Sequence, residues 1–267
     1  MRAFDAALLV PLAVVGLAVA GVVTALAVRV PPSLLAVALA SDEIVFAVGL
    51  SLKVSLAALA AAVAIGVPAA YVMARRPVPA RAVVDTLLDI PLVMPPLVAG
   101  VGLLMLLSRS MLGAPLARLG LDLLFSPAGA VVAQAFVAVS VVVRSARAAF
   151  ASVDPGFAQA AATLGAGPAA VFARVDLPLA ARGILAGAVL AWARALGEFG
   201  ATLMVVGATR LKTETLPMAV YLNIATGETE TAIACALVLL MLACLLLLAL
   251  RLVGRRAALG GHPAERR

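Results

Sequence analysis

Six long apolar runs restrict what this chain can fold into. A helix needs about 20 mostly apolar residues to cross the hydrocarbon core of a bilayer, and each run reaches or approaches that length. In the whole chain 65% of residues are hydrophobic and 12% are charged, whereas soluble domains average about 45–50% apolar and about 25% charged residues. We therefore predict one all-α, polytopic transmembrane domain over residues 1–267. The six predicted spans cover about residues 6–28, 44–74, 83–107, 128–143, 184–206 and 231–253.

The first apolar run has an alternative interpretation as a cleaved signal peptide. A signal peptide has a short basic start, an apolar core and a polar cleavage region. Here the run is about twice as long as such a core, and it ends at Arg29 without a polar cleavage region. The pattern favours a membrane span.

Composition and motifs exclude several other classes of protein. The net charge is +7, but aromatics are only 4% and do not alternate with a basic patch, so nucleic-acid binding is not expected. Cys235, Cys244 and His262 do not form a cluster with carboxylates along the chain, so no metal site is expected. The chain has no phosphate loop of the type Gly-x-x-x-x-Gly-Lys-Ser/Thr and no hydrolase motif. We therefore expect neither ATP binding through such a loop nor hydrolase activity of this chain.

Lys and Arg residues in the loops predict the orientation, since cytoplasmic loops carry an excess of them. With the N-terminus in the cytoplasm, 13 of the 20 fall in cytoplasmic segments and 5 in external ones, while Lys53 and Arg194 lie within spans. This predicts a multi-pass protein of the cell membrane with both termini cytoplasmic. It also predicts one long cytoplasmic loop, about Arg144–Gly183, where a cytoplasmic partner can dock.

That loop contains two predicted short helices. Asp154 and Pro155 are typical of the cap and the first residue of a helix, and the Ala-rich segment Gly156–Leu164 can continue it. A second helix is predicted over Ala169–Val175 and is expected to end at Pro178. The loop would thus form a compact knob with small side chains, which can enter a groove of another protein.

The loop resembles the signature of binding-protein-dependent ABC importer permeases: Glu-Ala-Ala, three residues, Gly, nine residues, then Ile-x-Leu-Pro. The matching residues are Gln159, Ala160, Ala161, Gly165, Val175, Leu177 and Pro178. The resemblance implies that the first short helix docks on a separate ATPase subunit and transmits its motion. Two positions depart from the pattern, Gln159 for Glu and Val175 for Ile. Gln159 lacks the charge of Glu, which removes any ion pair made there.

Further segments are similar to the molybdate/tungstate branch of this family. They are Leu50–Ser55, Ile90–Pro96, Arg194–Thr202 and Thr213–Pro217. The resemblance implies an importer of molybdate or tungstate, built from a homodimer of this chain, two ATP-binding subunits and an external binding protein. Sulfate/thiosulfate permeases share much of the Gly-Glu-Phe-Gly region and stay an alternative. A self-sufficient secondary transporter is a second alternative. It needs buried acidic groups, for which Glu198 is the clear candidate.

Two places within the spans are candidates for the translocation pathway. Pro95 and Pro96, with Pro91, interrupt the third span and remove backbone donors. They form either a bent gate helix or a kinked packing helix. Arg194 and Glu198 lie four residues apart and share one face of the fifth span. They are either a neutral pair that lets the helix insert or a pair that borders the pathway.

The fifth span also carries a stripe of small residues. Gly183, Gly187, Ala191 and Ala195 recur every four positions, which allows the backbones of two helices to approach closely. This predicts a central helix that packs either at a subunit interface or within one chain.

Overall fold

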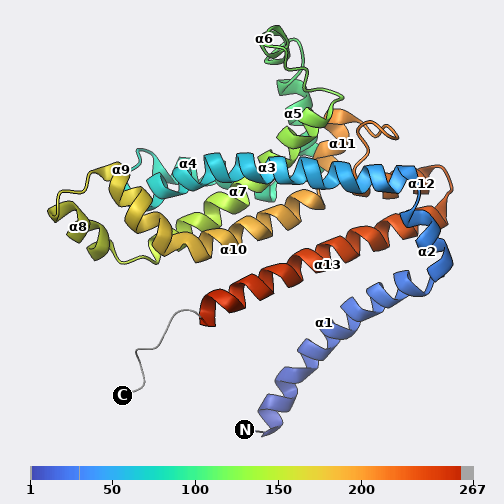
Figure 1. Cartoon of the computed structure of the whole chain (residues 1–267), viewed down its shortest axis with the longest axis horizontal. Helices are drawn as coiled ribbons and strands as arrows, with labels where there is room; N and C mark the ends of the chain where they lie inside the picture. Colours follow the sequence, from blue (N-terminus) through green and yellow to red (C-terminus); the bar gives the residue numbers. More distant parts are fainter. Residues whose placement is uncertain (1, 30, 260–267) are drawn as a thin grey trace.

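The computed structural model describes residues 2–29 and 31–259, and its regular elements there are all helices (Figure 1). Five are long and apolar enough to cross a membrane, or six when the bent pair α4–α5 counts as one span. This confirms the predicted all-α polytopic fold. The spanning elements are α1 (Arg2–Arg29), α3 (Asp42–Arg75), α4 (Arg81–Val93) with α5 (Pro96–Leu106), α7 (Pro127–Ala151), α10 (Leu177–Leu196) and α13 (Thr229–Leu259). The shorter elements are α2 (Pro32–Leu39), α6 (Gly113–Arg118), α8 (Pro155–Thr163), α9 (Pro168–Val171), η1 (Phe172–Asp176), α11 (Gly200–Val206) and α12 (Leu216–Ala225).

The segment between α7 and α10 is shorter than the predicted loop over residues 144–183. Helix α7 continues to Ala151, and the π-helical turn η1 leads directly into α10. We expected a helix to end at Pro178, and this is wrong. Pro178 lies in the first turn of α10. A proline is tolerated there because the first turn needs few backbone donors. At the start of α10, the N–H of Leu177 donates to the carbonyl of Phe172.

Helices α3, α7 and α10 form the centre of the molecule and pack through small side chains. A Cβ added at Gly66 of α3 would lie 2.9 Å from Val142 of α7, and one at Gly183 of α10 would lie 2.6 Å from Ala149. In lipid such close packing supplies much of the attraction between helices. The stripe from Gly183 to Ala195 therefore packs against α7 within the chain, which decides between the two interpretations of this stripe.

Two of the predicted spans are broken. The third is interrupted at Met94 and Pro95, where α4 and α5 meet at a bend of 112°. The fifth span was predicted as continuous, and this is wrong: α10 ends at Leu196 and α11 resumes at Gly200. The prolines remove backbone donors in the third span, and glycine disfavours helix at Gly197 and Gly200 in the fifth.

The first span stands apart from this centre. Helix α1 diverges from α13 in Figure 1, and no residue of its most apolar window is buried. Helix α13 runs from the end of the molecule that holds α2 and α12 back toward the end that holds α8 (Figure 1). His262 and the C-terminal tail lie outside the described residues.

A polar network joins the segment 207–215 to α3 and α12 at the end opposite α8. Arg210 donates to Glu228 (3.2 Å), and its Nε lies 3.6 Å from Glu43, which also accepts from Asn223 (3.0 Å). Glu214 is fully buried beside this network. Burial and then the negative charge of Glu43 raise the pKa of Glu214 to about 7. This acid was missed because the sequence places it in a loop.

The raised pKa of Glu214 predicts a pH-dependent stability. The usual value is 4.5, so the unfolded chain loses this proton before the folded chain does. Stability is therefore lost as pH rises from the unfolded pKa through the folded one. We expect Glu214→Gln to raise the unfolding midpoint of the purified protein at about pH 8 and to change it little at about pH 5. In chains of this size, the midpoint temperature of unfolding shifts by about 2–4 °C for each kcal/mol of change in the free energy of unfolding.

The matched control is Glu228→Gln, because Glu228 belongs to the same network and is half exposed. Thermal unfolding can be followed through the fluorescence of Trp192, the only tryptophan in the sequence. An equal gain at both pH values would contradict the assignment of a raised pKa to Glu214.

Candidate functional site

The two helix breaks lie against each other. A Cβ added at Gly100 of α5 would lie 2.8 Å from the Ala201 backbone in α11, and one at Gly200 would lie 2.9 Å from Pro96. The absence of side chains at both glycines thus lets α5 and α11 cross in close contact. Irregular backbone at membrane depth is tolerated only where protein or a water-filled cavity satisfies it.

A cavity of about 340 Å³ lies at this crossing. It brings together all four residues that the sequence identifies as pathway candidates, although they come from two distant segments. The lining residues are Pro95, Pro96, Leu97, Arg194, Gly197, Glu198, Phe199 and Gly200.

The carboxylate of Glu198 accepts two hydrogen bonds in this cavity. Its Oε1 accepts from the backbone N–H of Ala201 (2.9 Å), and its Oε2 accepts from Arg194 (2.6 Å). Glu198 is 1% exposed, whereas the side chain of Arg194 is 40% exposed. The carboxylate therefore satisfies a backbone donor at the start of α11, and the guanidinium is the more accessible member of the pair.

This geometry gives Arg194 and Glu198 different chemical capacities. Arg194 presents N–H donors on the open side, and planar guanidinium groups suit tetrahedral oxyanions. Glu198 neutralises that charge, so an anion held there would be held weakly. A conducting pathway requires such sites, because an ion must leave as readily as it enters.

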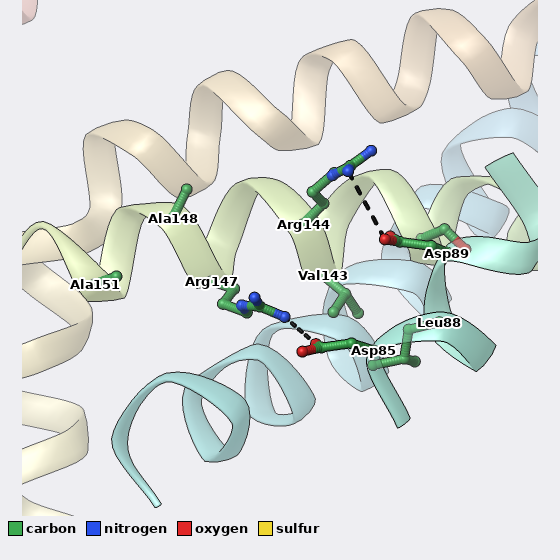
Figure 2. Close-up of a pocket in the computed structure, with 9 residues that line it drawn as sticks. Asp85, Leu88, Asp89, Val143, Arg144, Arg147, Ala148 and Ala151 are labelled. Carbon is green, nitrogen blue, oxygen red and sulfur yellow. Dashed lines mark hydrogen bonds and ion pairs between the residues drawn. The ribbon is translucent and has the colours of Figure 1, made fainter. Parts of the chain in front are cut away.

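A second cavity, of about 530 Å³, lies between α4 and α7 (Figure 2). Asp85 pairs with Arg147, and Asp89 lies 3.7 Å from Arg144. Helix α4 has no residue that is buried in the described chain, so these ion pairs contribute to holding it against α7. They were missed because both aspartates fall within a predicted span and both arginines were assigned to a loop. The spacing of Asp85 and Asp89, four residues apart, is the signal that could have indicated a shared helix face.

Helix α8 projects from one end of the bundle, as Figure 1 shows. Asp154 caps it by accepting from the N–H of Gly156 (2.8 Å), and Pro155 is its first residue, as predicted. None of its residues is buried, and the apolar side chains of Phe157 and Leu164, at its two ends, are 57% and 88% exposed. Helix α8 therefore presents two large apolar side chains at the surface of the described chain.

The residues of the loop signature occupy two different places. Gln159, Ala160 and Gly165 are exposed and Ala161 is half buried, all of them in or directly after α8. The other three signature residues lie where η1 leads into α10: Val175, Leu177 and Pro178.

Gly165 has a structural reason to be glycine. Its φ is +87°, a region that other residues rarely adopt. Its N–H donates to Ala162, and the N–H of Ala166 donates to Ala161, which is the Schellman arrangement at a helix end. A larger residue at this position would strain the backbone before it touched any partner.

Comparison with known proteins extends these observations. The family described as "Binding-protein-dependent transport system inner membrane component" matches residues 62–258. The chain is 40% identical to the molybdenum transport system permease protein ModB of Mycobacterium tuberculosis over 212 residues, which cover 79% of each chain. It is 43% identical to the ModB protein of Escherichia coli K12 over 195 residues, which cover 71% of this chain and 84% of that protein.

Solved structures share the fold at low identity. A bacterial ABC transporter involved in the import of alginate aligns with a TM-score of 0.75 at 17% identity and covers 95% of both chains. The MetNI methionine ABC transporter in an inward-facing conformation aligns with a TM-score of 0.65 at 18% identity and covers 80% of this chain and 95% of that one. With the family match over most of the sequence, these likenesses show that the chain belongs to the inner-membrane components of binding-protein-dependent transport systems.

Proposed function

We propose that this chain is the membrane permease of an ATP-driven molybdate importer. The observation that supports this most directly is 40–43% identity to permeases named for molybdenum transport. The chain is a transport subunit of the ABC type, and ATP hydrolysis belongs to a separate subunit. Tungstate, a tetrahedral dianion like molybdate, is proposed as a second substrate.

The complete importer is proposed to contain two copies of this chain. Each copy binds one ATP-binding subunit, which holds ATP and Mg²⁺, through the exposed surface of α8. An external binding protein delivers the anion from the opposite side. The excess of Lys and Arg on the side of α8 supports placing α8 and both termini in the cytoplasm.

The crossing of the broken spans is proposed as part of the pathway. Pro95 and Pro96 end one helix and start another there, and Arg194 offers a weak site to a passing anion. Glu198 keeps that site weak and also holds the start of α11 through Ala201. The meeting of all four candidates in one cavity supports this proposal.

The substrate is tested by uptake into proteoliposomes that contain the permease, its ATPase and the loaded binding protein. We expect ATP-dependent uptake of molybdate, competition by tungstate, and much weaker competition by sulfate. An ATPase with a substituted phosphate-loop lysine is the control. Equal competition by sulfate would favour a sulfate/thiosulfate permease, and uptake without ATP would favour a secondary transporter.

The docking surface is tested by Ala160→Asp. Ala160 is exposed on α8, so a charge there leaves the fold intact but is desolvated when a partner covers it, which costs about 2–5 kcal/mol. We expect co-purification of the ATPase to be lost. Ala80→Asp is the matched control, because Ala80 is exposed in the segment before α4 and Asp is a good helix cap. Normal assembly of the Ala160 variant would place the docking surface elsewhere.

The role of Arg194 is tested by the paired change Arg194→Gln with Glu198→Gln. Glutamine at 198 retains an oxygen that can accept from Ala201, and both charges are removed together, so no unpaired charge remains. We expect the variant to insert and to bind the ATPase but to transport at least about tenfold more slowly. Transport at the unsubstituted rate would leave the pair with a structural role only.

A further inference from the structure

One arginine side chain donates hydrogen bonds to both ends of the segment that carries α8. Arg75 lies in the last turn of α3, and its Nη2 donates to the carbonyl of Val153 (2.9 Å) and to Oδ1 of Asp176 (3.0 Å). Val153 directly precedes α8 and its cap, and Asp176 is the last residue of η1. The segment between them is thus closed into a loop whose two ends meet at one guanidinium.

Asp176 is tied into the bundle by a second bond. It is 1% exposed, and its Oδ2 accepts from the hydroxyl of Tyr71 (3.2 Å). Tyr71 lies one turn before Arg75 and therefore on the same face of α3. A buried carboxylate that loses its cationic partner is strongly destabilising, so this arrangement resists opening.

Aromatic contacts make the same junction rigid. The ring of Tyr71 packs edge-on against Phe150 of α7, with 5.3 Å between the ring centroids. It also packs edge-on against Phe172 of η1, with 4.6 Å between the centroids. The end of α3, the end of α7 and the start of η1 therefore form one packed unit, which we call the junction (Tyr71, Arg75, Phe150, Phe172 and Asp176).

Helix α8 itself is attached less firmly. It has no buried residue, and a cavity of about 420 Å³ separates it from the end of α3. Arg75, Arg76 and Gln159 line that cavity. A force applied to α8 can therefore reach the bundle through η1 and α9, which α8 contacts, and through the two ends of its segment. Both ends are hydrogen-bonded to Arg75.

We propose that Arg75 is a positioning residue that transmits displacement of α8 to α3. The two N–H donors of its Nη2 hold Val153 and Asp176 in a fixed relation, so that a displacement of these two ends is passed to the end of α3. Helix α3 in turn packs along α7, so its motion reaches the helices beside the broken spans. The proposal rests on the docking of an ATPase at α8 and names the residue through which that contact acts.

The test compares variants of the full permease assembled with its ATPase and binding protein in proteoliposomes. Arg75→Gln with Asp176→Asn removes both charges together and leaves no buried ion unpaired. Arg76→Gln is the matched control, because Arg76 is the next residue and lines the same cavity, while the two bonds belong to Arg75. Co-purification of the ATPase, ATP hydrolysis, molybdate uptake and the thermal unfolding midpoint are measured for each.

We expect the paired variant to retain the ATPase and to hydrolyse ATP, while molybdate uptake per ATP falls at least about tenfold relative to Arg76→Gln. A purely structural role would lower the unfolding midpoint without changing uptake per ATP. Uptake per ATP equal to that of the control would overturn the proposal. Loss of ATPase binding would also overturn it, because Arg75 would then shape the docking surface rather than transmit its motion.

Arg75→Lys supplies a second test that preserves the buried ion pair. Lysine keeps the charge beside Asp176, but its rotatable amine on a flexible stem replaces two N–H donors that are fixed in one plane. Uptake per ATP should therefore fall while the fold is retained. Normal coupling in this variant would contradict the proposal. The Ala160→Asp variant distinguishes failure of the docking proposal from failure of the proposal about Arg75. Normal ATPase binding by Ala160→Asp refutes docking at α8. Normally coupled transport by the Arg75 variants refutes only the role of Arg75.

Discussion

Backbone N–H and C=O groups find no hydrogen-bond partner in hydrocarbon, so they must be paired within the protein. This requirement governs the architecture of the chain. It makes the spans helical and makes each interruption costly unless protein or water satisfies the freed groups. The two interruptions lie together, where Gly100 and Gly200 allow α5 and α11 to cross closely. Glu198 then accepts a backbone N–H at the start of α11. The irregular backbone is thus concentrated at one place, which is also where a cavity forms.

The same medium makes charge expensive, and several charged groups near the spans are paired. Asp85 and Asp89 of α4 pair with arginines of α7, and Arg194 pairs with Glu198 within one span. Asp176, nearly inaccessible to solvent, is held by Arg75. Each pair joins elements whose relative position matters: a helix with little buried surface, a helix break, and the segment that carries α8. Charge pairing therefore contributes to positioning as well as to insertion.

Close packing of small residues completes the arrangement of the central helices. Gly66 and Gly183 bring α3 and α10 close to α7, and the junction at the end of α3 connects these helices to η1. A rigid bundle of this kind can carry motion from α8 over a long distance, because packed helices move as bodies rather than deform continuously. Helix α8 has no buried residue and lies outside this packing.

Much of this protein was predictable from the order of its residues. Run lengths determine the number and type of the spans, Asp154 and Pro155 determine where α8 begins, and the prolines at 95 and 96 determine the break in the third span. These features depend on local rules of helix formation and on the thickness of the bilayer. Gln159 to Pro178 likewise carry the family likeness without reference to any fold.

The tertiary structure alone decided which distant residues meet. The break at Gly197–Phe199 was not predicted, because glycine by itself disfavours a helix only by about 1 kcal/mol. Contacts with α5 and the side chain of Glu198 also stabilise the break. In the sequence, Arg75 is one of many basic residues expected on the cytoplasmic side, and Asp176 occupies the unspecified position of the Ile-x-Leu-Pro pattern. Their pairing is a contact across 101 residues. A linear sequence states the charge and the helix of each residue, but it does not state distances between helices, and those distances create the cavity, the ion pairs and the junction.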